Sequence, residues 1–117
     1  ERNAYGTLNE VVKKLDDGKS IIFFPEGTRS ESGELGKFKR GISMIILKSG
    51  RKVIPTAIMG SREYLPKSSI LSNPGHRDIC FRFGKPIEFP KVETEDRELS
   101  VDVVARVRSE VSKLLYN

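Results

Sequence analysis

The chain has 117 residues, of which 37% are hydrophobic and 32% are charged, a length and composition typical of one compact domain. Its longest apolar runs, 21–25 and 44–47, are far shorter than the ~20 residues that cross a bilayer. A single cysteine, Cys80, and a single histidine, His76, exclude an internal disulfide and a Cys/His zinc cluster, and they indicate a reducing compartment. The chain begins with Glu1 and shows no signal-peptide pattern, which predicts that it is a piece of a longer protein.

The net charge of +5 is concentrated in one segment. Residues 29–52 contain seven basic and two acidic side chains, which account for the whole excess. The basic residues are Arg29, Lys37, Lys39, Arg40, Lys48, Arg51 and Lys52. Such a segment favours a phosphate-bearing partner, whether a nucleotide, a lipid headgroup or an anionic membrane surface, although a merely solvated surface would have the same composition.

The first half of the chain predicts two helices separated by a buried strand. Apolar residues at helical spacing predict an amphipathic helix over about residues 3–17, which an Asp-Gly pair ends. The uninterrupted apolar run 20–24 predicts a strand that is buried on both faces. Glycines and charges predict a loop over 25–37, and a mostly apolar stretch predicts a buried helix over 38–49.

The second half predicts two strands and a final helix. Residues 52–59 form a strand pattern that Pro55 interrupts, which indicates a strand end, a bulge or an unpaired edge position. A long irregular loop over 60–77 precedes an alternating stretch, 79–83, which predicts a strand with one wetter face. Apolar spacing from about residue 100 onward predicts a C-terminal helix. This order predicts an α/β domain in which helices cover a short mixed sheet.

The strongest candidate site lies where the predicted strand ends and the basic loop begins. Ligands of open α/β sheets bind just beyond the carboxyl ends of strands. Pro25 sets the direction of the chain, Gly27 permits a turn whose N–H groups can bind an anion, and Arg29 offers a planar fork suited to phosphate. Glu26 can orient Arg29 or accept a hydrogen bond from a substrate hydroxyl. A surface turn with a Glu–Arg ion pair explains the same residues without a ligand.

Three runs of this chain resemble the third and fourth sequence blocks of the glycerolipid acyltransferases, above all the 1-acylglycerol-3-phosphate acyltransferases. They are Phe-Pro-Glu-Gly-Thr-Arg-Ser at 24–30, Lys-Phe-Lys-Arg-Gly at 37–41 and Val-Ile-Pro-Thr-Ala at 53–57. The resemblance covers roughly residues 5–90. It implies the α/β fold of that family and a third block that binds the phosphate of the acceptor. The residues it assigns to this site are Pro25, Glu26, Gly27, Thr28 and Arg29, with Lys39 and Arg40 assisting.

The resemblance does not extend to the catalytic block of the family, His-x₄-Asp. In that block the histidine is the general base for the acceptor hydroxyl, and the aspartate holds its tautomer and charge. Phe81 stands five positions after His76, Asp78 lies too close, and the block should precede the third block. The resemblance therefore implies a single, N-terminally truncated acyltransferase domain over residues 1–117, with no catalytic residue of its own and the dyad upstream of Glu1.

The activity implied is transfer of a fatty acyl group from a thioester, on CoA or acyl carrier protein, to lysophosphatidate, giving phosphatidate in phospholipid biosynthesis. No metal or cofactor is implied, and this piece alone is expected to be inactive. The lipid substrate, upstream segments and the basic segment imply association with the cytoplasmic face of a membrane. An unpaired apolar strand edge, at 20–24 or 52–59, predicts self-association. Glycerol 3-phosphate or another lysophospholipid is the alternative acceptor.

The remaining notable residues have structural explanations. Cys80 is expected to be a small buried residue, His76 to lie on a loop surface, and Phe81 and Phe83 to belong to the core. Basic residues alternate with these aromatic positions, as in single-strand binders, which combine basic grooves with exposed aromatic rings. A catalytically silent phosphate- or nucleic-acid-binding module is therefore an alternative function. The acidic run 93–98 works against a nucleic-acid partner.

Overall fold

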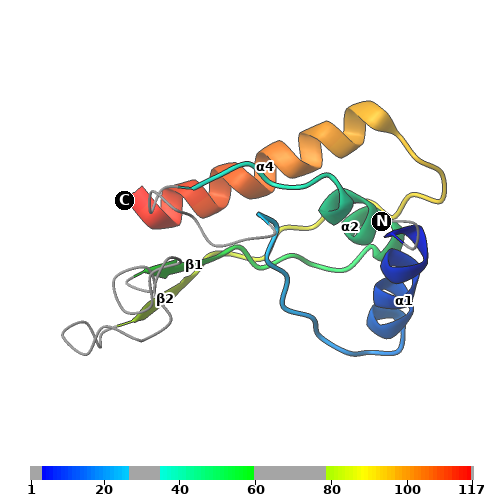
Figure 1. Ribbon diagram of the computed structural model, residues 1–117, viewed down its shortest axis with the longest axis horizontal. Coiled ribbons are helices and arrows are strands. Elements are labelled where there is room, and N and C mark those ends of the chain that lie inside the picture. The colour runs from blue at the N-terminus through cyan, green and yellow to red at the C-terminus, as the bar shows by residue number, and fades with distance from the viewer. Residues whose placement is uncertain (1–3, 27–34, 60–78, 117) are drawn as a thin grey trace.

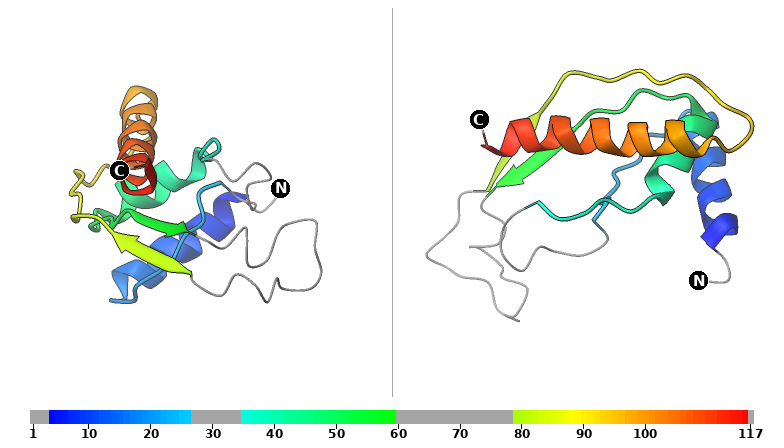
Figure 2. Two further views of the ribbon diagram at one scale, coloured as in Figure 1. Left: turned by 90° about the vertical axis from the view of Figure 1, so that its left-hand side faces the viewer. Right: turned by 90° about the horizontal axis from the view of Figure 1, so that it is seen from above.

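The computed structural model describes residues 4–26, 35–59 and 79–116. Its elements, in chain order, are α1 (Ala4–Asp16), α2 (Gly41–Ser49), β1 (Thr56–Met59), β2 (Cys80–Phe83) and α4 (Arg97–Tyr116). Figure 1 shows α4 lying along β1 and α2, while α1 packs on α2. Two further views place α1 and the C-terminal end of α4 at opposite ends of the molecule (Figure 2). The predicted α/β class is confirmed.

The amphipathic helix predicted near the N-terminus is confirmed as α1. Its apolar residues Leu8, Val11, Val12 and Leu15 are half-buried, and its charged positions face solvent. The Cδ2 atom of Leu8 lies 3.6 Å from the position that a Cβ on Gly41 would occupy, so α1 packs closely on the start of α2. The helix ends as the Asp-Gly pair predicts, with Gly18 donating its N–H to the carbonyl of Leu15 at 3.0 Å.

Helix α2 is the buried helix predicted over 38–49, and it begins three residues later, at Gly41. Its C-terminal stop is Gly50, which has a left-handed φ of 65° and donates its N–H to the carbonyl of Ile46. The carbonyl of Leu47 accepts a hydrogen bond of 2.8 Å from the N–H of Val92. This bond ties α2 to the segment that leads into α4.

We expect Gly50→Ala to lower the free energy of unfolding by about 1–2 kcal/mol, because an L side chain is strained at a left-handed φ. The new Cβ would also lie 2.9 Å from the Cβ of Lys91. Gly6→Ala is the matched control, since Gly6 lies inside α1 with nothing within 4 Å of a new Cβ. That variant should gain roughly 0.5–1 kcal/mol. Urea unfolding measures the free energy of unfolding of both variants. Equal changes in the two would contradict the left-handed conformation of Gly50.

The sheet is formed by β1 and β2, which pair antiparallel with Thr56 opposite Phe83 and Met59 opposite Cys80. An isolated bridge then joins Val53 to Ile87. Val53 and Thr56 are three residues apart, whereas their partners Ile87 and Phe83 are four residues apart. The chain after Phe83 therefore has one extra residue and bulges opposite Pro55. Pro55 thus lies just before the strand, and its carbonyl accepts the N–H of Gly84 at 2.8 Å. The sheet of the described residues is antiparallel, whereas a mixed sheet was expected.

The hydrophobic core lies between α2 and α4. Its buried members are Phe38, Ile42, Ile46, Leu47, Val103, Val107 and Val111. The three valines recur at a spacing of four residues, which places them on one face of a helix. The predicted C-terminal helix is therefore confirmed, and it begins at Arg97 rather than near residue 100.

Two predictions of burial were wrong. Residues 20–24 form no strand, and Ile22 and Phe24 are 85% and 67% exposed, because a strand needs a neighbour and none of the described residues pairs with this segment. Strand β2 was expected to have one wetter face, but all four of its residues are exposed. Phe81 and Phe83 therefore lie outside the core, and Cys80 is an exposed thiol. His76 and the long loop predicted over 60–77 lie outside the described residues.

Candidate functional site

The two ends of the loop singled out in the sequence are tied together by hydrogen bonds. The N–H of Lys39 donates to the carbonyl of Pro25 at 2.7 Å. The N–H of Gly36 donates to carboxylate oxygen Oε2 of Glu26 at 2.6 Å. Both bonds connect the segment after α1 to the segment that leads into α2, so Pro25, Glu26 and Lys39 lie close together. The carboxylate of Glu26 therefore closes the base of the loop.

Side chains of helix α4 also hydrogen-bond to the C-terminal end of this loop, at Leu35 and Gly36. The guanidinium of Arg108 donates from Nε to the carbonyl of Gly36 and from Nη2 to the carbonyl of Leu35, both at 2.9 Å. The hydroxyl oxygen of Tyr116 accepts the N–H of Leu35 at 3.1 Å. The helix surface that carries Arg108 and Tyr116 also borders an open depression of about 460 Å³, which is lined by α4 side chains.

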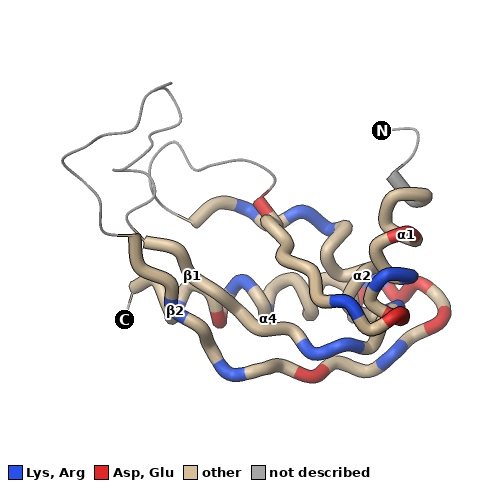
Figure 3. Tube along the Cα trace, turned by 90° about the horizontal axis from the view of Figure 1, so that it is seen from below, with Lys and Arg blue, Asp and Glu red and all other residues tan. Residues whose placement is uncertain are grey.

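The basic segment divides into two groups in the structure. Lys37, Lys39 and Arg40 are exposed on the approach to α2, and the ion pairs among the described residues do not use them. Lys52, in contrast, pairs with Glu88 at 3.6 Å, and Arg51 donates to the carbonyl of Leu15. The tube in Figure 3 shows basic positions on the segment entering α2 and on the segment leaving it. The first group is available to an anion.

The structure brings together three of the seven predicted site residues, Pro25, Glu26 and Lys39, and Arg40 follows Lys39 as the residue that precedes α2. The other three, Gly27, Thr28 and Arg29, lie outside the described residues.

Arg108 is a residue of this region that was not predicted from the sequence. A signal for it exists, because Arg108 stands four residues after Val104 and three before Val111, so it is a charged residue on the apolar face of a helix. Such a position requires buried or half-buried polar partners, which the carbonyls of the loop base supply.

Comparison with known proteins decides the family. The family model described as Acyltransferase matches residues 1–59, half of the chain. The chain belongs to the acyltransferase family. The chain is 43% identical over 86 residues to the chloroplastic 1-acyl-sn-glycerol-3-phosphate acyltransferase BAT2 of Brassica napus. The aligned residues cover 72% of the chain and 23% of that relative. The chain is also 36% identical over 94 residues to the chloroplastic enzyme LPAT1 of Arabidopsis thaliana, covering 79% of the chain and 26% of the relative.

A solved structure supports the fold of this acyltransferase chain. The crystal structure of the 1-acyl-sn-glycerophosphate (LPA) acyltransferase PlsC from Thermotoga maritima matches with a TM-score of 0.72 at 33% identity. The match covers 94% of the chain and 44% of PlsC. The chain therefore spans under a third of the curated relatives above and under half of this structure. Among the described helices, none combines the length and apolarity needed to cross a bilayer.

Proposed function

We propose that this chain is part of an enzyme that transfers a fatty acyl group from an acyl thioester to lysophosphatidate. The thioester is carried by CoA or acyl carrier protein. The free hydroxyl of the acceptor attacks the thioester carbonyl, the C–S bond breaks, and phosphatidate and a free thiol leave. Support comes from the names of the relatives, which are 1-acyl-sn-glycerol-3-phosphate acyltransferases, and from the match to PlsC.

The role of this part is to bind the acceptor phosphate. The observation that carries the proposal is the pair of hydrogen bonds that brings exposed Lys39 close to Pro25 and Glu26, with exposed Arg40 next along the chain. Cations carried on a tied backbone attract a phosphate dianion, and the backbone of the site does not have to be ordered when the phosphate binds. The full assignment is Pro25, Glu26, Gly27, Thr28, Arg29, Lys39 and Arg40, in which Glu26 shapes the loop and the basic residues contact the phosphate.

The catalytic dyad is assigned to residues that precede this chain in the intact enzyme. The basis is the family pattern His-x₄-Asp, which His76 and Phe81 do not satisfy. A further basis is the share of the relatives that the chain spans, 23% and 26% of the first two. In this proposal the 117 residues are the C-terminal part of one acyltransferase domain.

An acceptor comparison with the intact enzyme tests the function. With one acyl thioester, we expect thiol release to be fastest with lysophosphatidate and slower with glycerol 3-phosphate or lysophosphatidylcholine, whose phosphate is a diester. A preference for glycerol 3-phosphate would shift the assignment to the alternative acceptor. Binding of lysophosphatidate without thiol release would support a catalytically silent phosphate-binding module instead, and retention of an oligonucleotide would support the nucleic-acid alternative.

The intact enzyme is further proposed to lie at the cytoplasmic face of a membrane. The acceptor is a lipid, and the exposed cations Lys37, Lys39 and Arg40 are attracted to anionic headgroups. Upstream segments would supply the rest of the attachment.

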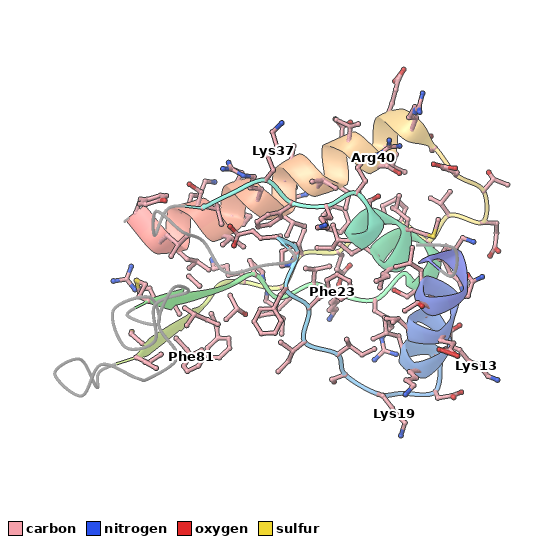
Figure 4. The ribbon with its side chains drawn as sticks, in the orientation of Figure 1. Lys13, Lys19, Phe23, Lys37, Arg40 and Phe81 are labelled. Carbon is pink, nitrogen blue, oxygen red and sulfur yellow. The ribbon has the colours of Figure 1, made fainter. Side chains whose placement is uncertain are left out.

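We expect the isolated chain to self-associate because large apolar side chains are uncovered. The exposed apolar residues around the sheet and the segment after α1 are Ile22, Phe23, Phe24, Ile54, Ile79, Phe81 and Phe83. Figure 4 labels Phe23 on that segment and Phe81 on β2. Exposed apolar patches and unpaired strand edges recruit other chains, and in the intact enzyme the preceding part of the domain is proposed to cover them.

Sedimentation velocity of the isolated chain measures this self-association. Phe81→Ser combined with Phe83→Ser should shift the chain toward the monomer. Val101→Ser is the matched control, because Val101 is 58% exposed on α4, away from the sheet. A monodisperse, cooperatively folded monomer of the unmodified chain would contradict the proposal.

A further inference from the structure

Two adjacent residues, Leu35 and Gly36, are held by side chains from two different parts of the chain. Arg108 binds both of their carbonyls, and Tyr116 accepts the N–H of Leu35. The N–H of Gly36 donates to Glu26. All four backbone polar groups of this pair therefore have a side-chain partner. Such complete satisfaction by side chains fixes both the place and the rotation of an irregular segment.

The geometry leaves little freedom at this point. A Cβ on Gly36 would lie 2.9 Å from Oε2 of Glu26, so any other side chain here would force that carboxylate to shift and would disturb its bond to the N–H of Gly36. The guanidinium of Arg108 is planar, and its two N–H bonds reach two consecutive carbonyls at the same distance of 2.9 Å. A lysine at this position could donate to one carbonyl at a time from a flexible stem.

This fixed pair begins the segment that carries the exposed cations. Lys37, Lys39 and Arg40 follow directly, and Figure 4 labels Lys37 and Arg40 along the stretch beside α4. Their backbone is also held by the bond from the N–H of Lys39 to Pro25, and by the N–H groups of Ile42 and Ser43, which donate to the carbonyls of Lys39 and Arg40. Arg108 on α4 therefore holds the N-terminal end of the stretch that carries these side chains, while Pro25 and α2 hold its C-terminal end.

We propose that Arg108 is a positioning residue for the acceptor-phosphate site. It acts through the backbone of Leu35 and Gly36, and it touches neither the phosphate nor the reacting atoms. The inference rests on the proposed function, in which Lys39 and Arg40 contact the acceptor phosphate. Its consequence is that α4, which lies outside the 1–59 match to the family model, contributes to acceptor binding.

The test uses Arg108→Met in the intact enzyme, with two readouts. Hydrogen–deuterium exchange should rise over residues 35–40 while the protection of α4 is retained. The KM for lysophosphatidate should rise about tenfold, less than the ~10²-fold that a 1 Å misplacement can cost, with the slow hydrolysis of the thioester unchanged. Arg108→Lys should recover part of the acceptor KM, because it keeps one of the two donors.

Arg106→Met is the matched control. Arg106 lies on the same helix, but its guanidinium sits 5.9 Å from the ring centre of Phe89. Removing it should change neither the exchange over residues 35–40 nor the acceptor KM.

Three results would overturn the inference. Unchanged exchange over residues 35–40 in Arg108→Met would show that Arg108 does not hold the segment. A second such result is a raised exchange in Arg108→Met with an unchanged acceptor KM, when Arg40→Gln does weaken acceptor binding. It would show that Arg108 does not position the site, and it would leave the proposed function standing. Absence of transfer to lysophosphatidate by the unmodified enzyme would instead overturn the proposed function, and the role of Arg108 with it.

Discussion

The isolated 117-residue chain is expected to release no thiol from an acyl thioester above the buffer rate when lysophosphatidate is added. Acyl transfer to a hydroxyl needs a general base, which contributes ~10²–10⁴-fold to the rate, and this chain has no His-x₄-Asp block. The site proposed for it binds phosphate and carries cations, and a protonated Lys or Arg accepts no proton from a hydroxyl. Binding without turnover is therefore the expected behaviour.

A thiol-release assay with the intact enzyme as positive control measures this. His76→Ala in the isolated chain is the informative variant, because His76 is the single histidine of the chain. Turnover by the isolated chain that disappears in His76→Ala would show that this histidine is the base and that the dyad was assigned to the wrong part of the protein.

Arg29→Ala in the intact enzyme should lower kcat/KM for lysophosphatidate by about 10- to 150-fold. This is the effect of losing one charge-assisted contact of ~1.5–3 kcal/mol. Arg29→Lys should restore only part of the loss, because an ammonium is a point charge whereas a guanidinium grips two phosphate oxygens. The hydrolysis of the thioester donor, which needs no acceptor, should change little.

Arg97→Ala controls for the change in net charge, since Arg97 is an exposed arginine at the start of α4. It should leave both reactions unaffected. Equal losses of transfer and of hydrolysis in Arg29→Ala would mean that Arg29 supports the fold or the donor site, and its assignment to the phosphate would have to be dropped.

Local pattern was sufficient for the helices and for the family. The apolar spacing of α1 and α4 and the glycines that follow α1 and α2 are signals that act within a few residues, so the helix ends lie close to their predicted positions. Pro55 likewise predicts an irregular position in the strand pattern 52–59, because proline has no N–H to donate to a neighbouring strand. The motif over 24–30 indicated the acyltransferase family, to which the chain belongs.

Local pattern thus predicts the helices and the motif, whereas the contacts that these elements make depend on segments far apart in the chain. The apolar run 20–24 predicts a buried strand, but burial requires a partner, and among the described residues this run has no strand beside it. Cys80 and Phe81 do lie on a paired strand, opposite Met59 and Ile58, but the described residues leave their side chains uncovered. The hydrogen bonds from Arg108 to the carbonyls of Leu35 and Gly36 join residues 73 and 72 positions apart; the spacing on α4 marks Arg108 as a charged residue on an apolar face, but it does not say which backbone groups Arg108 contacts.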